Sequence, residues 1–136
     1  MHTFAKTILA SGLLAASLGA QAANVLVVLS DADHLDLKDG KVYPTGFYLN
    51  ELMQPTKLLL DAGHSLTFAT PSGLAPTMDV TSDAAQYFGG DAASLAEHKA
   101  LLSKLKLTDA NSSPVISLAR VEQIGYQHFA ALYGPG

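Results

Sequence analysis

Residues 24–30 (NVLVVLS) are a continuous apolar run rich in valine, and this run constrains the fold more than any other feature of the sequence. A strand that is apolar on both faces has to be buried on both faces. Such strands are typical of parallel sheets covered by helices, whereas a sheet with one wet face alternates polar and apolar residues. The run therefore predicts a parallel strand within an α/β domain.

A helix and a second strand follow this run. Residues 50–62 have an apolar face at helical spacing, for which Asn50 is a suitable N-cap and Gly63 a suitable C-terminal stop. Residues 65–70 (SLTFAT) are the next apolar run. A strand, a helix and a strand in this order predict a β-α-β unit whose two strands are parallel.

The segments around this unit are less regular. Residues 31–45 are expected to be a polar loop, and residues 71–90, with their prolines and glycines, an irregular segment. Residues 92–105 have a helical pattern. Both Asp91 and a capping box that begins at Ser94 are candidates for the N-terminus of this helix.

Two further apolar segments complete the pattern. Residues 115–119 could form a short strand, and residues 129–133 (FAALY) predict a third strand of the main sheet. The alternating order predicts a three-layer α/β sandwich around a mainly parallel sheet. Ligands of such sheets bind beyond the carboxyl ends of the strands. Here those ends are Ser30-Asp31, Thr70-Pro71 and Tyr133-Gly134.

The first residues have the pattern of a cleavable secretory signal peptide. Lys6 supplies a positive charge, residues 7–20 are uncharged and apolar or small, and Ala20 and Ala22 suit a signal peptidase. A membrane anchor would need a longer apolar run, of about 20 residues. We therefore expect cleavage between Ala22 and Ala23 and export of the mature chain, most simply to the periplasm.

The composition excludes several classes of partner. The chain has a net charge of −4, so it offers no basic surface to nucleic acid or to an anionic membrane. No second apolar run after the signal peptide is long enough to span a bilayer. There is no cysteine, so the exported chain cannot use disulfides and has to depend on its hydrophobic core.

Neither the acidic loop nor the histidines predict a metal site. The loop that begins at Asp31 lacks the EF-hand residues, because Leu35, Asp36 and Val42 stand where an oxygen ligand, glycine and glutamate are required. The five histidines include no H-E-x-x-H motif and no pair four residues apart. A solvated acidic loop is the better interpretation.

Two features belong to the predicted binding edge of the sheet. Glu51 lies in the first turn of a helix, where a carboxylate interacts favourably with the helix dipole. Alternatively, a carboxyl group at this edge could be partly desolvated and act as an acid or base. Residues 134–136 (GPG) could be a simple turn, or could direct backbone N–H groups at a developing oxyanion.

Four stretches resemble one family across nearly the whole mature chain. They are VLVVLSDAD, GKVYPTGFYLNELMQP, LLLDAGHSLTFATPSGLAPTMD with the Ser-Asp pair that follows it, and YQHFAALYGPG. The second is specific, with Thr-Gly, four residues, Glu51 and then Pro55. The chain thus resembles the ThiJ/PfpI superfamily, with its glutamine-amidotransferase-like, flavodoxin-like fold, and within it the chaperone and glyoxalase III branch.

The resemblance implies an active site with a nucleophilic cysteine and an assisting histidine. Glu51 matches the glutamate that tunes the thiol or acts as its acid/base partner, and Gly136 matches a glycine whose backbone contributes to the oxyanion hole. No cofactor is implied. The cysteine and histidine have no counterpart in this chain. Residues 23–136 are therefore expected to be the N-terminal half of such a domain, which is inactive by itself.

The activity that the resemblance implies for the whole protein is conversion of the small 2-oxoaldehyde methylglyoxal to D-lactate without glutathione. A holdase chaperone that binds unfolded client proteins is an alternative, and so is a peptidase or amidase. Members of the family are commonly homodimers. A half domain would also have an open strand edge and uncovered apolar helix faces.

Overall fold

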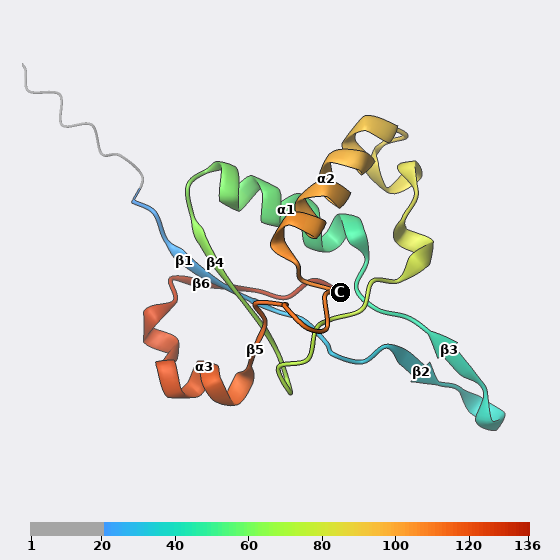
Figure 1. The fold of residues 1–136 in the computed structure, drawn as a ribbon, viewed down its shortest axis with the longest axis horizontal. Coiled ribbons are helices and arrows are strands. Elements are labelled where there is room, and N and C mark those ends of the chain that lie inside the picture. Colours follow the sequence, from blue (N-terminus) through green and yellow to red (C-terminus); the bar gives the residue numbers. More distant parts are fainter. Residues whose placement is uncertain (1–20) are drawn as a thin grey trace, which may run out of the picture.

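The valine-rich run forms strand β1 (Asn24–Val28) at an inner position of a four-stranded sheet in the computed structural model, which describes residues 21–136 (Figure 1). The strand order is β5–β4–β1–β6, with β4 at Ser65–Thr70, β5 at Ile116–Ser117 and β6 at Ala131–Tyr133. Every pairing in this sheet is parallel. The predicted parallel α/β sheet is confirmed, whereas most of the predicted signal peptide lies outside the described residues.

Helices cover both faces of the sheet. Helices α1 (Leu49–Asp61) and α2 (Ala92–Leu105) lie on one face, and α3 (Leu118–Ile124) lies on the other (Figure 1). Alternate residues of β1 point to the two sides, since Val27 belongs to the core under α1 and α2 and Leu26 to the core under α3. The predicted three-layer arrangement is therefore confirmed.

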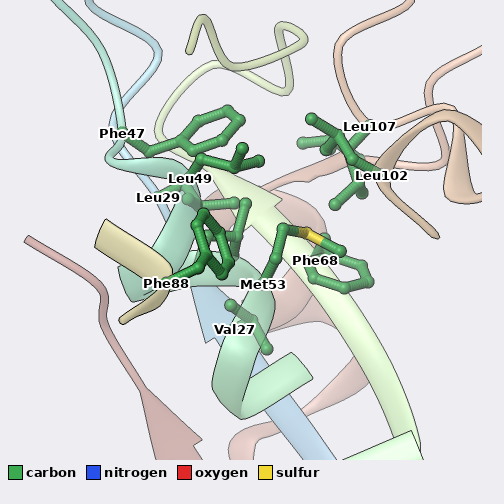
Figure 2. Packing of buried hydrophobic residues seen from close by; sticks show 11 residues of the cluster. Val27, Leu29, Phe47, Leu49, Met53, Phe68, Phe88, Leu102 and Leu107 are labelled. Carbon is green, nitrogen blue, oxygen red and sulfur yellow. The ribbon is translucent and has the colours of Figure 1, made fainter. Parts of the chain in front are cut away.

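The larger core lies between the sheet and α1. Val27 and Phe68 from the sheet and Met53 from α1 point into it (Figure 2). Leu49, Leu52 and Met53 are fully buried, and burial of each such side chain contributes about 1.5–3 kcal/mol. This apolar face fixes the rotation of α1 about its own axis and so decides which way Glu51 points.

The two ends of α1 differ in how well the sequence predicts them. Gly63 has a φ of 86°, and the N–H groups of Gly63 and His64 donate to the carbonyls of Leu60 and Leu59 at 2.9 and 3.0 Å. This is a Schellman ending, and it confirms the predicted stop. At the other end the prediction of Asn50 as N-cap is wrong, because the helix begins one residue earlier, at Leu49.

Helix α2 begins where the sequence predicts. The carboxylate of Asp91 accepts hydrogen bonds from the N–H groups of Ala93 and Ser94 at 2.9 and 3.2 Å. Ser94 itself lies inside the helix, so the rival capping box is not used. On the apolar face of α2, His98 and Leu102 are buried.

The predicted polar loop at 31–45 is instead a β-hairpin. Strands β2 (His34–Asp36) and β3 (Val42–Pro44) pair antiparallel, and a short 3₁₀ turn, Lys38–Gly40, joins them. All six strand residues are exposed, and the hairpin projects from the body of the molecule (Figure 1). Because nothing covers it, its sequence carries no strong burial pattern that would have predicted strands.

The end of the chain is more helical than expected. Only Ile116–Ser117 of the segment 115–119 is strand, and α3, which the sequence analysis missed, follows directly. Ser117 caps α3 by accepting a hydrogen bond from the N–H of Arg120 at 3.1 Å. With only Val121 fully buried, this short helix leaves little periodicity in the sequence. Among the described residues, no helix is both long and apolar enough to cross a bilayer.

Candidate active site at the carboxyl edge of the sheet

The carboxyl ends of β1 and β6 and the start of α1 come together at one edge of the sheet. Residues after β1 (Leu29 and Ser30) and Gly136 after β6 line the same small cavity, of about 60 Å³. The end of β4 does not take part in this cavity. Thr70 is fully buried, and its hydroxyl donates to the carbonyl of Leu74 at 2.8 Å. Asp31 is also used structurally, since its carboxylate accepts the N–H of Ser72 at 2.8 Å.

A larger open groove of about 480 Å³ lies between α1 and the residues that follow β6. The end of the chain lies beside the start of α1, which forms one wall of this groove (Figure 1). The groove combines a carboxylate, two amide side chains, a phenol and backbone groups of a glycine-rich turn. Its lining residues are Asn50, Glu51, Gln54, Pro55, Leu58, Tyr133, Gly134, Pro135 and Gly136.

The structure brings the two predicted site residues together. A Cβ atom added to Gly136 would lie 3.4 Å from Oε2 of Glu51, so the Glu51 carboxylate lies directly beside the Gly136 backbone. Glu51 is exposed, so of the two environments that the sequence left open, the partly desolvated one is not observed. The carboxylate still benefits from its place in the first turn of α1, where the helix dipole favours negative charge.

The loop before α1 is held by a second segment of chain. The N–H of Phe47 donates to the carbonyl of Thr77, and the N–H of Asp79 donates to the carbonyl of Phe47, both at 2.9 Å. A Cβ atom on Gly46 would lie 1.9 Å from the Thr77 carbonyl oxygen, so only glycine fits at this position. The Thr-Gly pair therefore has a structural role in placing the start of α1.

Ser82 caps α1 from the same segment. Its Oγ accepts a hydrogen bond from the N–H of Leu49 at 2.9 Å, while its hydroxyl donates to the carbonyl of Asp79 at 2.6 Å. Ser82 is fully buried and lies 33 residues from Leu49 in the sequence. A cap supplied from such a distance explains why local sequence patterns pointed to Asn50 instead.

Asp79 stabilises this capping segment. Its carboxylate accepts hydrogen bonds from the Thr81 hydroxyl (2.7 Å), the Thr81 N–H (2.9 Å) and the Thr45 hydroxyl (3.0 Å). These hydrogen bonds, above all the one from the Thr81 hydroxyl, hold the pKa of Asp79 below its usual value. The sequence analysis missed Asp79 and Ser82, although an Asp followed two residues later by Thr is typical of a local Asx turn.

The sequence analysis places Tyr133 at the carboxyl end of a strand but gives it no contact with α1. It is half-buried at the end of β6, and its hydroxyl donates a hydrogen bond to the backbone carbonyl of Glu51. Burial, and secondarily the negative charge of Glu51, raise the pKa of the Tyr133 phenol. A polar tip at the end of an otherwise apolar strand was the available signal.

Three histidines have contacts in the structure, and the exposed His34 lies beside Asp33, with Nδ1 2.6 Å from its carboxylate. His98 is buried, with Nδ1 at 2.7 Å from the Ser94 carbonyl and its ring 5.0 Å from that of Phe88. The Nδ1 of His64 accepts the N–H of Ala23 at 3.0 Å. Within residues 21–136, no three His, Asp or Glu side chains are grouped closely enough to hold a metal ion.

Fold and site together define an α/β protein with a parallel sheet and a carboxylate-bearing groove at the carboxyl edge of that sheet. No protein-family model matches the chain, and no curated protein matches it either. The ThiJ/PfpI assignment therefore stays a prediction that rests on the resemblance of the motifs.

Proposed function

We propose that the groove between α1 and the Gly134–Gly136 turn is part of the active site of an exported ThiJ/PfpI-type protein, which converts methylglyoxal to D-lactate without glutathione. One observation carries this proposal. The carboxylate of Glu51 and the backbone of Gly136 lie side by side at the carboxyl edge of a parallel sheet. This is the edge at which proteins with such sheets bind their ligands.

The reaction needs a base and a site for a negatively charged oxygen. Conversion of a 2-oxoaldehyde to a 2-hydroxy acid adds one water and moves one hydrogen from the aldehyde carbon to the neighbouring carbonyl carbon. An exposed carboxylate such as Glu51 can accept that proton and return it. Backbone N–H groups of the turn at Gly136 can donate to the oxygen on which charge develops.

The proposed nucleophile is a cysteine, and residues 1–136 contain no cysteine. The proposal therefore places the nucleophile outside these residues. A cysteine thiolate would add to the aldehyde carbon and form a hemithioacetal. Proton transfer through Glu51 would then give a 2-hydroxyacyl thioester, and hydrolysis by water would release the acid and restore the thiol. Residues 1–136 alone are accordingly expected to produce no lactate from methylglyoxal.

The test uses the protein extended by the sequence encoded after Gly136, purified after export and assayed with methylglyoxal in the absence of glutathione. We expect D-lactate as the product, and a mature N-terminus at Ala23 by mass spectrometry. Lactate formation that requires added glutathione would overturn the proposed reaction. Release of amine from amide substrates with no lactate would favour an amidase in its place.

A second candidate function, a holdase chaperone, is favoured by an adjoining apolar groove, which shares Pro55, Leu58 and Tyr133 with the first. This groove has a volume of about 310 Å³ and lies along the edge strand β6. Its walls include Leu58 and Leu132, whose exposed fractions are 71% and 64%. Suppression of the aggregation of a heat-denatured client by an extended protein whose cysteines are replaced by serine would support this function.

A further inference from the structure

Pro55 leaves one backbone carbonyl of α1 without its helical partner. In an α-helix the carbonyl of residue i accepts from the N–H of residue i+4. For Glu51 that residue is Pro55, which lies inside α1 and has no N–H. The missing bond therefore falls on the residue that carries the candidate catalytic carboxylate.

A side chain from the far end of the chain supplies the missing donor. The hydroxyl of Tyr133 donates to the Glu51 carbonyl, and the two residues are 82 positions apart in the sequence. Tyr133 is itself held on its other side, since it pairs with Val27 in the sheet and packs against the larger core. The position of its hydroxyl is thus set by β6 and not by α1.

The same hydrogen bond joins the two halves of the groove. Glu51 lies in the first turn of α1, and Tyr133 is the last residue of β6, directly before the Gly134–Gly136 turn. A shift of α1 relative to β6 would separate the Glu51 carboxylate from Gly136. The Tyr133 hydroxyl opposes that shift, because moving the helix would leave the Glu51 carbonyl without a donor.

We propose that Tyr133 is a positioning residue for Glu51, in which its hydroxyl replaces the helical hydrogen bond that Pro55 cannot make and so holds the carboxylate beside Gly136. The significance of this arrangement for catalysis rests on the proposed function. The replacement of one hydrogen bond by the other does not, and it can be tested without any turnover.

The first test is a double-mutant cycle between Tyr133 and Pro55, measured by urea unfolding. Tyr133→Phe should raise the unfolding equilibrium constant about fivefold, as for loss of one typical hydrogen bond. In a Pro55→Ala background the substituted alanine has an N–H that can bond to the Glu51 carbonyl. There the same Tyr133→Phe change should have less than about a twofold effect. An equal effect of Tyr133→Phe in both backgrounds would overturn the replacement.

Tyr126→Phe is the matched control. It deletes the same hydroxyl group from a tyrosine that is 51% exposed and whose hydroxyl has no hydrogen-bond partner among the described residues. We expect less than a twofold change in the unfolding constant, with or without Pro55. An effect as large as that of Tyr133→Phe would mean that the cycle measures the loss of any tyrosine hydroxyl group and not of this hydrogen bond.

The second test separates positioning from stability. The amide chemical shift of Gly136 in NMR should depend on the neighbouring Glu51 carboxylate. The Glu51-dependent part of this shift is the part that Glu51→Gln removes. Tyr133→Phe should reduce this part at least twofold. Pro55→Ala should restore the stability of the Tyr133→Phe variant without restoring this part, because the substitution repairs the helix but not the contact with β6. An unchanged Glu51-dependent part in Tyr133→Phe would rule out positioning.

The two proposals fail in different ways. If the extended protein forms no lactate, the proposed function is lost, while the unfolding cycle and the Gly136 chemical shift still decide the role of Tyr133. If both of these readouts are insensitive to Tyr133→Phe, the positioning role is lost, and the assignment of Glu51 is unaffected.

Discussion

Gly46 shows how strongly a single residue can be constrained by a neighbouring segment. A Cβ atom at this position would lie 1.9 Å from the Thr77 carbonyl oxygen, which is backbone and cannot rotate away. Gly46→Ala should therefore break the pairing between Phe47 and Thr77 and destabilise the fold by about 2–4 kcal/mol. Urea unfolding measures this loss.

Gly134→Ala is the control for that substitution. A Cβ atom on Gly134 would meet only the Val28 carbonyl oxygen, at 3.8 Å, and Gly134 is not in a left-handed conformation. The free energy of unfolding of the Gly134→Ala variant should differ from that of the wild type by less than about 0.5–1 kcal/mol. Similar losses for the two variants would show that the crowding at Gly46 does not control stability.

Asp79 makes the free energy of unfolding depend on pH in the acid range. Hydrogen bonds, first of all from the Thr81 hydroxyl, lower the pKa of Asp79 in the folded protein below its ordinary value of 3.8. The folded state therefore gains stability from the ionised carboxylate above that ordinary pKa and loses it as the pH falls through the lowered value. The stability advantage of the wild type over Asp79→Asn should be constant near neutral pH and shrink below about pH 4.

Urea unfolding of both proteins between about pH 7 and about pH 2.5 measures this advantage across the window in which the carboxylate is protonated. A difference that is independent of pH over this range would contradict the assigned role of the Asp79 carboxylate.

Glu51 and Gly136 could be singled out at the residue scale because each belongs to a short local motif, and their roles in catalysis stay a prediction. The contacts of Ser82 and Tyr133 could not be predicted, since their partners lie 33 and 82 residues away in the sequence. Asp79 combines a local partner, Thr81, with a distant one, Thr45. The sequence leaves two environments open for Glu51, and the structure shows the exposed one in the first turn of α1. Its carboxylate faces an open groove, which no local pattern of side chains can reveal.

At the scale of elements, α1 depends on a cap from outside the helix. Ser82→Ala would leave the buried N–H of Leu49 without an acceptor, while the carbonyl of Asp79 would lose the hydroxyl donor but keep the backbone N–H of residue 82. We expect a loss of about 1–3 kcal/mol in unfolding free energy. Ser103→Ala, an exposed serine inside α2, is the control and should change stability by less than about 0.5 kcal/mol. A loss for Ser82→Ala no larger than that of the control would contradict the capping role.

The elements that the sequence predicts best are those that bury a continuous face or end in a strong local signal. Strand β4 (Ser65–Thr70) and helix α2 (Ala92–Leu105) have the predicted bounds. The hairpin of β2 and β3 buries nothing, and α3 fully buries only Val121. Elements of this kind have little hydrophobic periodicity, so the sequence pattern does not predict them and only the structure shows them.

At the scale of the whole molecule, the edge strand β6 and the apolar groove beside it form a surface prone to association. Leu58 and Leu132 are large, exposed and close to an unpaired strand edge. Leu58→Lys should lower light scattering at high concentration and binding of a hydrophobic dye, with little change in unfolding free energy. Val80→Lys removes an equally exposed side chain, 77% exposed, outside this groove, and should have little effect. Equal effects of the two substitutions would contradict a role for the groove.

The fold as a whole was predictable because an apolar strand, a helix and a second apolar strand allow few arrangements. The parallel sheet and its two covered faces follow from β1 and β4 alone. The way in which β6 and the turn after it form one wall of the groove was not predictable. That depends on where β6 places Tyr133 relative to α1, which is a property of the assembled sheet.

The role of Glu51 in the proposed reaction is the central claim, and one comparison tests it most directly. In the extended protein, initial rates of D-lactate formation from methylglyoxal are measured for the wild type, Glu51→Gln and Glu122→Gln. Glu122 is an exposed glutamate on α3, away from the groove, and is the matched control. We expect Glu51→Gln to lower kcat by about 10²–10⁴-fold and Glu122→Gln to leave it unchanged. A Glu51→Gln variant as active as the Glu122→Gln variant would contradict the claim.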